Sequence, residues 1–238
     1  YDFHLINAFK NKVLKWGYQV EIYEKDLDKL ILDKPEDGLN FVWVGRLIKL
    51  KHCDDAIRVV KRLKDNGYNP KLTIIGYGDE ENKLKLLVEK LKLKENIIFK
   101  GKCSIEDTRK EMDKANIFLF TSDKREGWGA TLNEAMNSAC ACIATKEAGS
   151  TNFLIENEKD GIVYDAGNVE QLYSSVIKLV GDKKLRENIA RNAYLKMYNV
   201  WNPKKSYKRL IKLMSAIVNN EDLELFQDGP CSKALSIK

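Results

Sequence analysis

Short apolar runs alternate with longer amphipathic segments from Leu39 onward. The runs NFVWVG, KLTIIG, NIIFKG, NIFLF, CIAT and GIVY have the length of buried strands. The segments between them have helical spacing, such as DDAIRVVKRLKDNG, which ends at a glycine, and SIEDTRKEMDKA, which Ser104 opens. This alternation predicts the α/β class, a doubly wound parallel sheet with helices on both faces. Ligands of such sheets bind at the carboxyl ends of the strands.

The beginning of the sequence has a different pattern. Residues 1–37 contain an amphipathic piece around Phe9, Val13 and Leu14, a strand-like GYQVEIY, and the charged segment EKDLDKLILDKPEDG, which predicts a linker. We expect this stretch to be the trailing segment of another domain, followed by a central domain over residues 38–200.

The end of the sequence, residues 201–238, predicts an amphipathic helix and a tail. Pro203 suits the first position of a helix. Helical spacing places six apolar residues on one face: Tyr207, Leu210, Ile211, Met214, Ile217 and Val218. Such a face needs a partner surface, which we expect in the sheet or in a domain outside this sequence.

Composition places the chain among ordinary globular proteins. It has 238 residues, enough to bury a substantial core, and 44% of them are hydrophobic. The net charge of +6 arises from lysines spread over helical segments, which favours solvated faces over a nucleic-acid surface. Anionic small molecules and an anionic membrane surface remain compatible partners. Without an apolar run of membrane-spanning length or a signal peptide, we expect a cytoplasmic protein with possible peripheral membrane contact.

The cysteines and histidines do not form a metal-binding pattern. Five cysteines (Cys53, Cys103, Cys140, Cys142 and Cys231) include no CxxC pair, and His4 and His52 are the two histidines. The sequence therefore predicts no metal site and thiols that serve as small core residues in a reducing compartment.

The loops after the first and second strands carry candidate binding residues. In VGRLIKLK, Gly45 precedes Arg46, and Lys51 follows five positions later. Both cations can lean over one spot at the sheet edge, where they suit a diphosphate, although either could be a surface residue at a helix start. Gly76 and Gly78 in GYG lack the third glycine of a dinucleotide fingerprint and predict an ordinary turn near the site.

The loop after the fourth strand, EGWGATLNEAM, carries the strongest signal. Gly127 and Gly129 permit a sharp turn that brings the loop, with Trp128, into contact with a ligand. The amides of Gly129, Ala130, Thr131 and Leu132 would open a helix and form an anion site. Glu126 and Glu134 bracket this anion site, where carboxylates can accept hydrogen bonds from sugar and ribose hydroxyls.

Taken together, GRLIKLK, GYG, FKG, EGWGATLNEAM, CIAT and DGIVY resemble the donor-binding domain of retaining GT-B glycosyltransferases of family 4, over roughly Asn40 to Val200. The resemblance implies one Rossmann-like half of a GT-B fold. It implies that Arg46 and Lys51 bind the donor diphosphate, that Glu126 contacts the transferred sugar, and that Glu134 holds the ribose. It also implies that Gly101, Lys102 and Cys103 flank the nucleotide base.

The resemblance further implies the reaction. A hexosyl unit would pass from a UDP- or GDP-type sugar with retention of configuration, in surface polysaccharide or lipopolysaccharide synthesis. No cofactor or metal is expected, because cations and helix amides replace the metal. The acceptor, a free or lipid-linked sugar, would be bound by a preceding domain. A DxD pair, Asp26 and Asp28, holds a metal in some sugar transferases, but here it lies in the predicted linker.

The sequence also departs from the family pattern at three places. His52 occupies a position where the family usually has glycine, ACAC at 139–142 replaces glycine and proline, and Asn152 stands where glutamate is frequent.

Other functions of the same fold remain as alternatives to a transferase. A nucleotide-sugar epimerase of the same plan would need further acids and bases. The chain could instead be a non-catalytic nucleotide-sugar-binding module or a regulatory partner of an active transferase. The lack of a third glycine disfavours a Rossmann oxidoreductase.

Overall fold

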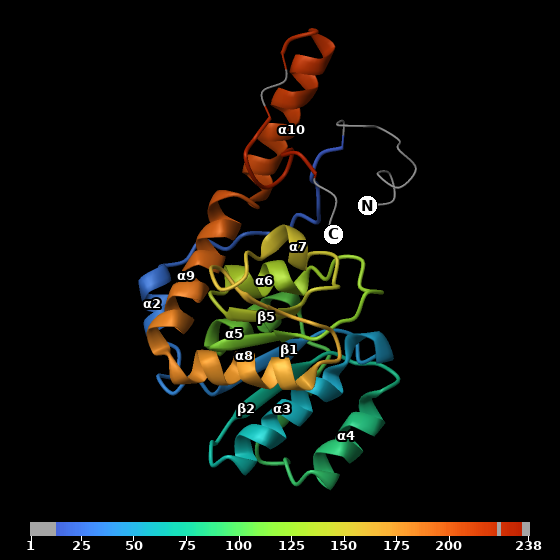
Figure 1. Ribbon diagram of the computed structural model, residues 1–238, viewed down its shortest axis with the longest axis vertical. Coiled ribbons are helices and arrows are strands. Elements are labelled where there is room, and N and C mark those ends of the chain that lie inside the picture. Colours follow the sequence, from blue (N-terminus) through green and yellow to red (C-terminus); the bar gives the residue numbers. More distant parts are fainter. Residues whose placement is uncertain (1–12, 223–224, 235–238) are drawn as a thin grey trace.

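The computed structural model describes residues 13–222 and 225–234, and it is built on one parallel sheet (Figure 1). The strand order is β3-β2-β1-β4-β5-β6, and every pair of neighbours is parallel. The strands are β1 (Asn40–Val44), β2 (Lys71–Ile75), β3 (Ile97–Gly101), β4 (Ile117–Phe120), β5 (Ala141–Thr145) and β6 (Ile162–Tyr164). The order steps outward from β1 in both directions, so the predicted Rossmann-like, doubly wound α/β fold is confirmed.

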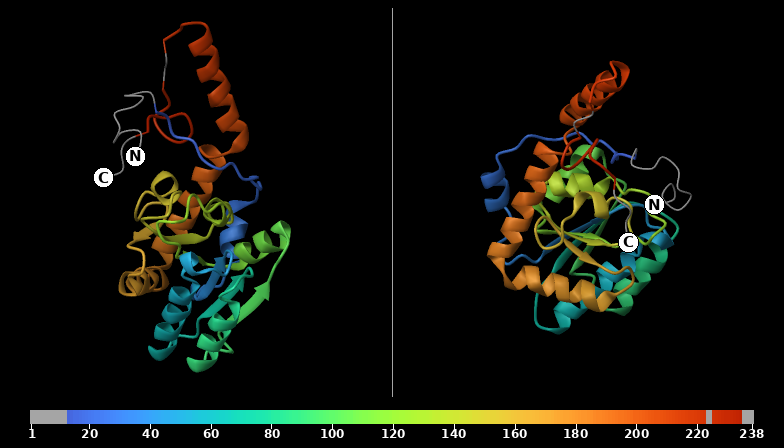
Figure 2. Two further views of the ribbon diagram at one scale, coloured as in Figure 1. Left: turned by 90° about the vertical axis from the view of Figure 1, so that its right-hand side faces the viewer. Right: turned by 45° about the horizontal axis from the view of Figure 1, so that its top comes forward.

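Helices pack on both faces of the sheet, except α10, which lies apart from it (Figures 1 and 2). The helices are α2 (Leu27–Leu32), α3 (Cys53–Asp65), α4 (Glu81–Lys90), α5 (Ile105–Lys114), α6 (Thr131–Asn137), α7 (Thr151–Leu154), α8 (Val169–Gly181), α9 (Lys183–Asn199) and α10 (Pro203–Val218), with a 3₁₀ turn, η1 (Lys49–Lys51). The Ser104 side chain accepts a hydrogen bond from the Asp107 amide at the start of α5, as predicted for an N-cap.

Two hydrophobic cores lie on opposite sides of the sheet. In β1, Phe41 and Trp43 belong to one core and Val42 to the other. In β4, Leu119 and Phe120 divide in the same way. Because a strand alternates its side chains, only near-continuous apolar runs can fill both cores, which explains why these strands were readable in the sequence. Four thiols are buried and Cys103 is partly buried, which agrees with their prediction as small core residues.

The segment before the sheet differs from the prediction. GYQVEIY forms no strand, and the predicted linker contains α2. The backbone of residues 17–26, which we call the connector, bonds to side chains of α6 and α9 instead of to a sheet edge. The Tyr23 amide donates to Asn137 (2.9 Å), and the Lys25 amide donates to the Tyr194 hydroxyl (2.8 Å). Leu14 forms an antiparallel bridge with Lys233, whereas Phe9 and His4 lie outside the described residues.

Helix α10 begins at Pro203, as predicted, and Asn202 caps it. It extends away from the sheet (Figure 2). Its apolar face is exposed: Ile211 is 63% accessible and Val218 is 78% accessible. The sheet therefore does not cover this face, and that part of the prediction is wrong. Among the described residues, no helix is both long and apolar enough to span a membrane.

Candidate functional site

The backbones of the turns that follow β1 and β2 are in direct contact. The Gly45 amide donates to the Ile75 carbonyl (3.0 Å), and the Leu47 amide to the Tyr77 carbonyl (2.8 Å). A Cβ at Gly76 would lie 1.8 Å from the Gly45 carbonyl oxygen, and one at Gly78 would lie 2.4 Å from that of Leu47. Both glycines are thus required by close backbone approach, which makes the GYG turn tighter than the ordinary turn we predicted.

Lys51 and Glu126 form an ion pair between the loops that follow β1 and β4. Their side chains are 14% and 12% exposed, so water screens the pair only partly. The Ser122 hydroxyl also donates to Glu126 (3.3 Å). The Lys51 carbonyl accepts a hydrogen bond from the Thr121 hydroxyl (2.6 Å). These contacts join two predicted site residues that lie far apart in the sequence.

His52 adds a second link between the same loops. Its Nε2 lies 3.0 Å from the Asp123 carboxylate. Asp123 also pairs with Arg125, whose guanidinium is the main cause that holds the pKa of Asp123 well below its usual range. His52 has a left-handed backbone (φ 46°), which favours glycine and explains why a glycine is usual at this position. The contact with Asp123 offsets that strain.

Arg46 directly follows Gly45, is exposed and lines a shallow pocket. The pocket is lined by Val44, Gly45, Arg46, Ile75, Gly76, Tyr77, Lys102, Cys103 and Thr108. The Lys102 ammonium lies 5.7 Å from the centre of the Tyr77 ring. The structure therefore brings Arg46, the GYG turn and the Lys102–Cys103 segment together, while Lys51 faces Glu126.

The loop from Glu126 to Gly129 is shaped by close contacts. A Cβ at Gly129 (φ 80°) would lie 2.2 Å from the Phe120 ring, whereas none of the described atoms restricts a side chain at Gly127. The Gly149 amide donates to the Glu126 carbonyl (2.9 Å), and a Cβ at Gly149 would lie 1.9 Å from the Gly127 carbonyl oxygen. Sequence reasoning missed Gly149, although it lies in the stretch AGST (148–151), whose small residues are typical of a turn.

Trp128, predicted to contact the ligand, is a buried anchor of this loop. Its ring is 8% exposed, and its indole nitrogen donates to Asn133 (2.9 Å). It packs against Phe153 and Trp201, with ring centroids 5.4 Å and 5.7 Å away. A Cβ at Gly17 of the connector would lie 2.0 Å from the Trp128 ring. Trp128 therefore joins the loop to the connector and the core.

The first turn of α6 follows Ala130. The Leu132 amide already donates to the Gly129 carbonyl (3.0 Å), so it is not an open anion donor as we had expected. The Thr131 hydroxyl is buried and has no hydrogen-bond partner among the described residues. It is therefore an unsatisfied buried donor in the first turn of α6.

Glu134 lies in the first turn of α6 and is partly buried. Across residues 13–222 and 225–234, its carboxylate has no hydrogen bond or ion pair. Burial raises the pKa of Glu134, and the positive charge of Arg109 opposes that rise. An unpartnered carboxylate of this kind is able to accept hydrogen bonds from ligand hydroxyls.

The DxD aspartates have structural partners. Asp26 accepts the Lys29 amide (3.1 Å) and caps α2, and Asp28 pairs with Arg191 (2.6 Å). Within the described part of the chain, no group of at least three histidine, cysteine, aspartate or glutamate side chains could hold a metal ion.

Comparisons with known proteins agree on one family. The model of the family "Glycosyl transferases group 1" matches residues 24–196. An uncharacterised glycosyltransferase of Methanocaldococcus jannaschii is 29% identical, with 92% of this chain and 56% of the relative covered. The capsular polysaccharide biosynthesis glycosyltransferase CapM of Staphylococcus aureus is 27% identical, with 87% and 54% covered. The chain thus spans about half the length of these relatives.

A solved structure shares the fold. It is a point mutant of S. aureus TarM in complex with Fondaparinux, alpha-GlcNAc-glycerol and UDP. The TM-score is 0.70 at 20% identity, and the match covers 87% of this chain and 40% of that one. At this identity the likeness establishes the fold of the matched half alone.

Proposed function

The chain belongs to the glycosyl transferases group 1 family, and on this premise we propose that it binds a nucleotide diphosphate sugar at the ends of β1, β2 and β4. The sugar is a hexosyl unit, and the nucleotide is of the UDP or GDP type. Transfer proceeds with retention of configuration, for the synthesis of a surface polysaccharide or lipopolysaccharide. The UDP in the TarM complex and the capsular role in the name of CapM support this choice.

The observation that carries the proposal is the ion pair of Lys51 and Glu126 between the loops that follow β1 and β4. Arg46 lies in the first of these loops, and Glu134 lies on α6, which follows the second. β1 lies beside β4 in the sheet, so their carboxyl ends open at the same edge. Two cations for a diphosphate and two carboxylates for hydroxyls are the groups that a nucleotide sugar requires.

Each residue takes one role in the proposed complex. Arg46 and Lys51 bind the diphosphate, and the Thr131 hydroxyl and the amides that open α6 add hydrogen bonds. Glu126 contacts the sugar, and Glu134 accepts from the ribose. The base lies in the pocket beside Arg46, against Lys102 and Cys103.

The proposed chemistry follows from these positions. Negative charge grows on the departing diphosphate in the transition state, so cations aimed at it lower the barrier and do more than tighten binding. These groups supply the charge that a metal provides in other transferases. A diphosphate bound to Lys51 must share the Lys51 ammonium with Glu126. Diphosphate binding is therefore coupled to the position of the Glu126 carboxylate, which contacts the sugar.

A thermal-shift panel tests the proposal. UDP-, GDP- and ADP-sugars are added to the chain in excess, with the corresponding free sugars as controls. Selective stabilisation by one nucleotide sugar would identify the donor, because a ligand that binds only the native state raises the melting temperature. Equal melting temperatures with every nucleotide, at concentrations up to millimolar, would refute a donor site.

We further propose that the acceptor binds outside the described site, in a preceding domain of a longer protein. Proximity contributes to catalysis only when both reactants are held in one closed cleft. The chain should therefore bind the donor without transferring its sugar. The assay compares donor turnover by this chain and by an N-terminally extended one, with free and lipid-linked sugar acceptors, and efficient transfer by this chain alone would contradict the proposal.

The competing functions lead to different results in the same assays. A non-catalytic nucleotide-sugar-binding module would bind the donor, but the extended chain would leave it intact in the presence of every acceptor. An epimerase would convert the donor to its epimer without an acceptor. The partly buried Lys51–Glu126 pair and the open Glu134 carboxylate favour the transferase over a degenerate module.

A further inference from the structure

Arg109 of α5 is a buried cation that the proposed donor site does not yet explain. Its side chain is 3% exposed, although it lies in a helix whose sequence, IEDTRKEMDK, is mostly polar. Burial of a guanidinium is costly unless it is hydrogen-bonded and faces an opposite charge. The position of Arg109 therefore calls for a compensating group nearby.

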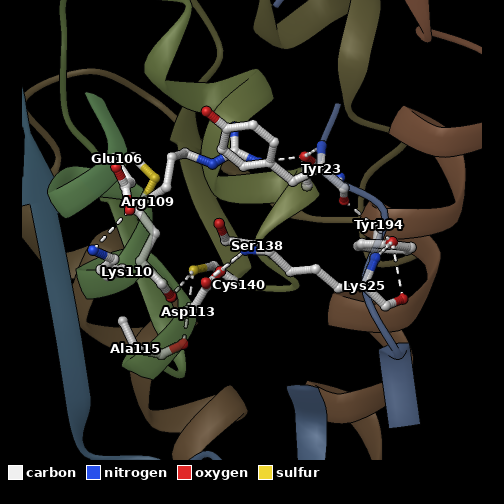
Figure 3. Close-up of polar contacts among 12 residues, drawn as sticks. Tyr23, Lys25, Glu106, Arg109, Lys110, Asp113, Ala115, Ser138, Cys140 and Tyr194 are labelled. Carbon is white, nitrogen blue, oxygen red and sulfur yellow. Dashed lines mark hydrogen bonds and ion pairs between the residues drawn. The ribbon is translucent and has the colours of Figure 1, made fainter. Parts of the chain in front are cut away.

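The guanidinium is held by Asn137 and Tyr23. One terminal nitrogen donates to the Asn137 side-chain oxygen, and the guanidinium lies 4.8 Å from the centre of the Tyr23 ring (Figure 3). Asn137 also binds the Tyr23 backbone through both of its amide atoms. Three elements, α5, α6 and the connector, thus define the orientation of Arg109, while its Nε is buried and unbonded among the described residues.

The nearby negative charge is Glu134. Asn137 and Glu134 are three residues apart on α6, so their side chains lie on the same side of that helix. Asp113 also acts on Arg109, but Lys25 already pairs with Asp113 (2.5 Å). Glu134 has no bonded partner in the described part of the chain, and Arg109 is the charged side chain whose field acts on it.

We propose that Arg109 is a positioning residue for the donor site, whose buried charge beside Glu134 favours the anionic carboxylate that accepts hydrogen bonds from the nucleotide's ribose hydroxyls. The binding of the ribose by Glu134 rests on the proposed function, whereas the effect of Arg109 on the charge of Glu134 is independent of it. Arg109 does not bond to Glu134, and this leaves both carboxylate oxygens available to the ligand. Because Tyr23 and Asn137 hold the guanidinium, the connector takes part in defining the site.

The direct test is a titration without ligand. Carboxyl ¹³C shifts are followed in the chain labelled at glutamate, and Glu134 is identified by the signal that is missing in Glu134→Gln. Arg109→Gln removes the charge but can still donate to Asn137, and Arg109→Lys retains a charge and serves as the matched control. We expect the pKa of Glu134 to be higher in Arg109→Gln than in the wild type and close to wild type in Arg109→Lys.

An unchanged titration midpoint of Glu134 in Arg109→Gln would overturn the proposal. If that variant fails to fold, Asn137→Leu replaces it, because this change releases the guanidinium and keeps both charges. A midpoint that rises in Asn137→Leu supports the proposal, and an unchanged one contradicts it.

A second readout uses UDP as the probe, by calorimetry between about pH 8 and about pH 5.5 at fixed ionic strength. As pH falls, Arg109→Gln should lose more affinity than wild type and Arg109→Lys, by about tenfold at the acid end, because removal of the charge raises the pKa of Glu134 further. Glu134→Gln should be weak at every pH. An equal loss at every pH in Arg109→Gln would show a merely structural role. Absence of UDP binding in the wild type would refute a UDP donor site and leave the carboxyl titration to decide the role of Arg109.

Discussion

Replacement of Lys51 by alanine should weaken UDP binding far more than replacement of Arg46. Lys51 is mostly buried and already bonded to Glu126, whereas Arg46 is exposed. Lys51→Ala removes a charge-assisted contact with the diphosphate, worth about 1.5–3 kcal/mol. It also leaves the Glu126 carboxylate unpaired beside an anion.

The second effect can be estimated from Coulomb's law. Two unit charges about 6 Å apart in a medium of effective dielectric constant about 20 repel by about 3 kcal/mol, which is an upper bound at a partly hydrated site. Reduced by hydration to about 1–2 kcal/mol, this repulsion brings the total loss to about 2.5–5 kcal/mol, or roughly 10²- to 10⁴-fold in affinity. For Arg46→Ala we expect only the loss of the charge-assisted contact, which lowers UDP affinity about tenfold.

The double variant Lys51→Ala/Glu126→Gln separates the two contributions. Removing the unpaired carboxylate should restore about tenfold of the lost UDP affinity, a coupling of about 1–2 kcal/mol. Calorimetry measures UDP affinity in the wild type, Lys51→Ala, Glu126→Gln and the double variant, with Arg46→Ala for comparison. Thermal unfolding without ligand controls for the stability of each chain. If Lys51→Ala were no worse than Arg46→Ala, and the added Glu126→Gln restored nothing, the ion pair would have no part in nucleotide binding.

Three further predictions concern other parts of the chain. Burial raises the pKa of Asp55 to about 6, so the stability that its protonated form contributes at acid pH is lost as pH rises through about 6. At pH 8, Asp55→Asn should therefore have a free energy of unfolding up to about 3 kcal/mol higher than that of the wild type. Chemical denaturation that shows no pH-dependent difference between the two would contradict this. Lys34 donates to the carbonyls of residues 112, 113, 115 and 138, so Lys34→Met should lose about 3 kcal/mol of unfolding free energy, whereas a loss below about 1 kcal/mol would mean that water replaces these bonds. Nucleotide binding should persist in excess chelator, and its loss in a calorimetric titration with EDTA would return Asp26 and Asp28 to consideration as metal ligands.

The strands could be predicted because burial on both faces leaves a strong local pattern. Runs such as NIFLF fill two cores at once, and few other structures bury four consecutive apolar residues. GYQVEIY has the alternating apolar and polar residues of a strand but forms none. The Tyr23 backbone at its end bonds to Asn137 and Tyr194, which lie more than 100 residues away, and a local pattern contains no information about such partners.

The positions of the site loops could also be predicted, but not the contacts between them. The sequence places Lys51 and Glu126 after different strands, and their pairing follows from β1 lying beside β4, a consequence of the strand order. Arg109 carried no signal, because a single arginine in a polar helix ordinarily lies on the surface. Its burial depends on how the connector crosses α5 and α6, which emerges only from the packed chain.

A crystal structure of the chain with UDP would test the donor site most directly. The phosphates should lie between Arg46 and Lys51, and the ribose hydroxyls should bond to the Glu134 carboxylate. The base should occupy the pocket beside Lys102. A nucleotide bound elsewhere, for example in the hollow next to β6 lined in part by Asn157 and Gln171, with Glu134 and Lys51 untouched, would contradict the proposed donor site.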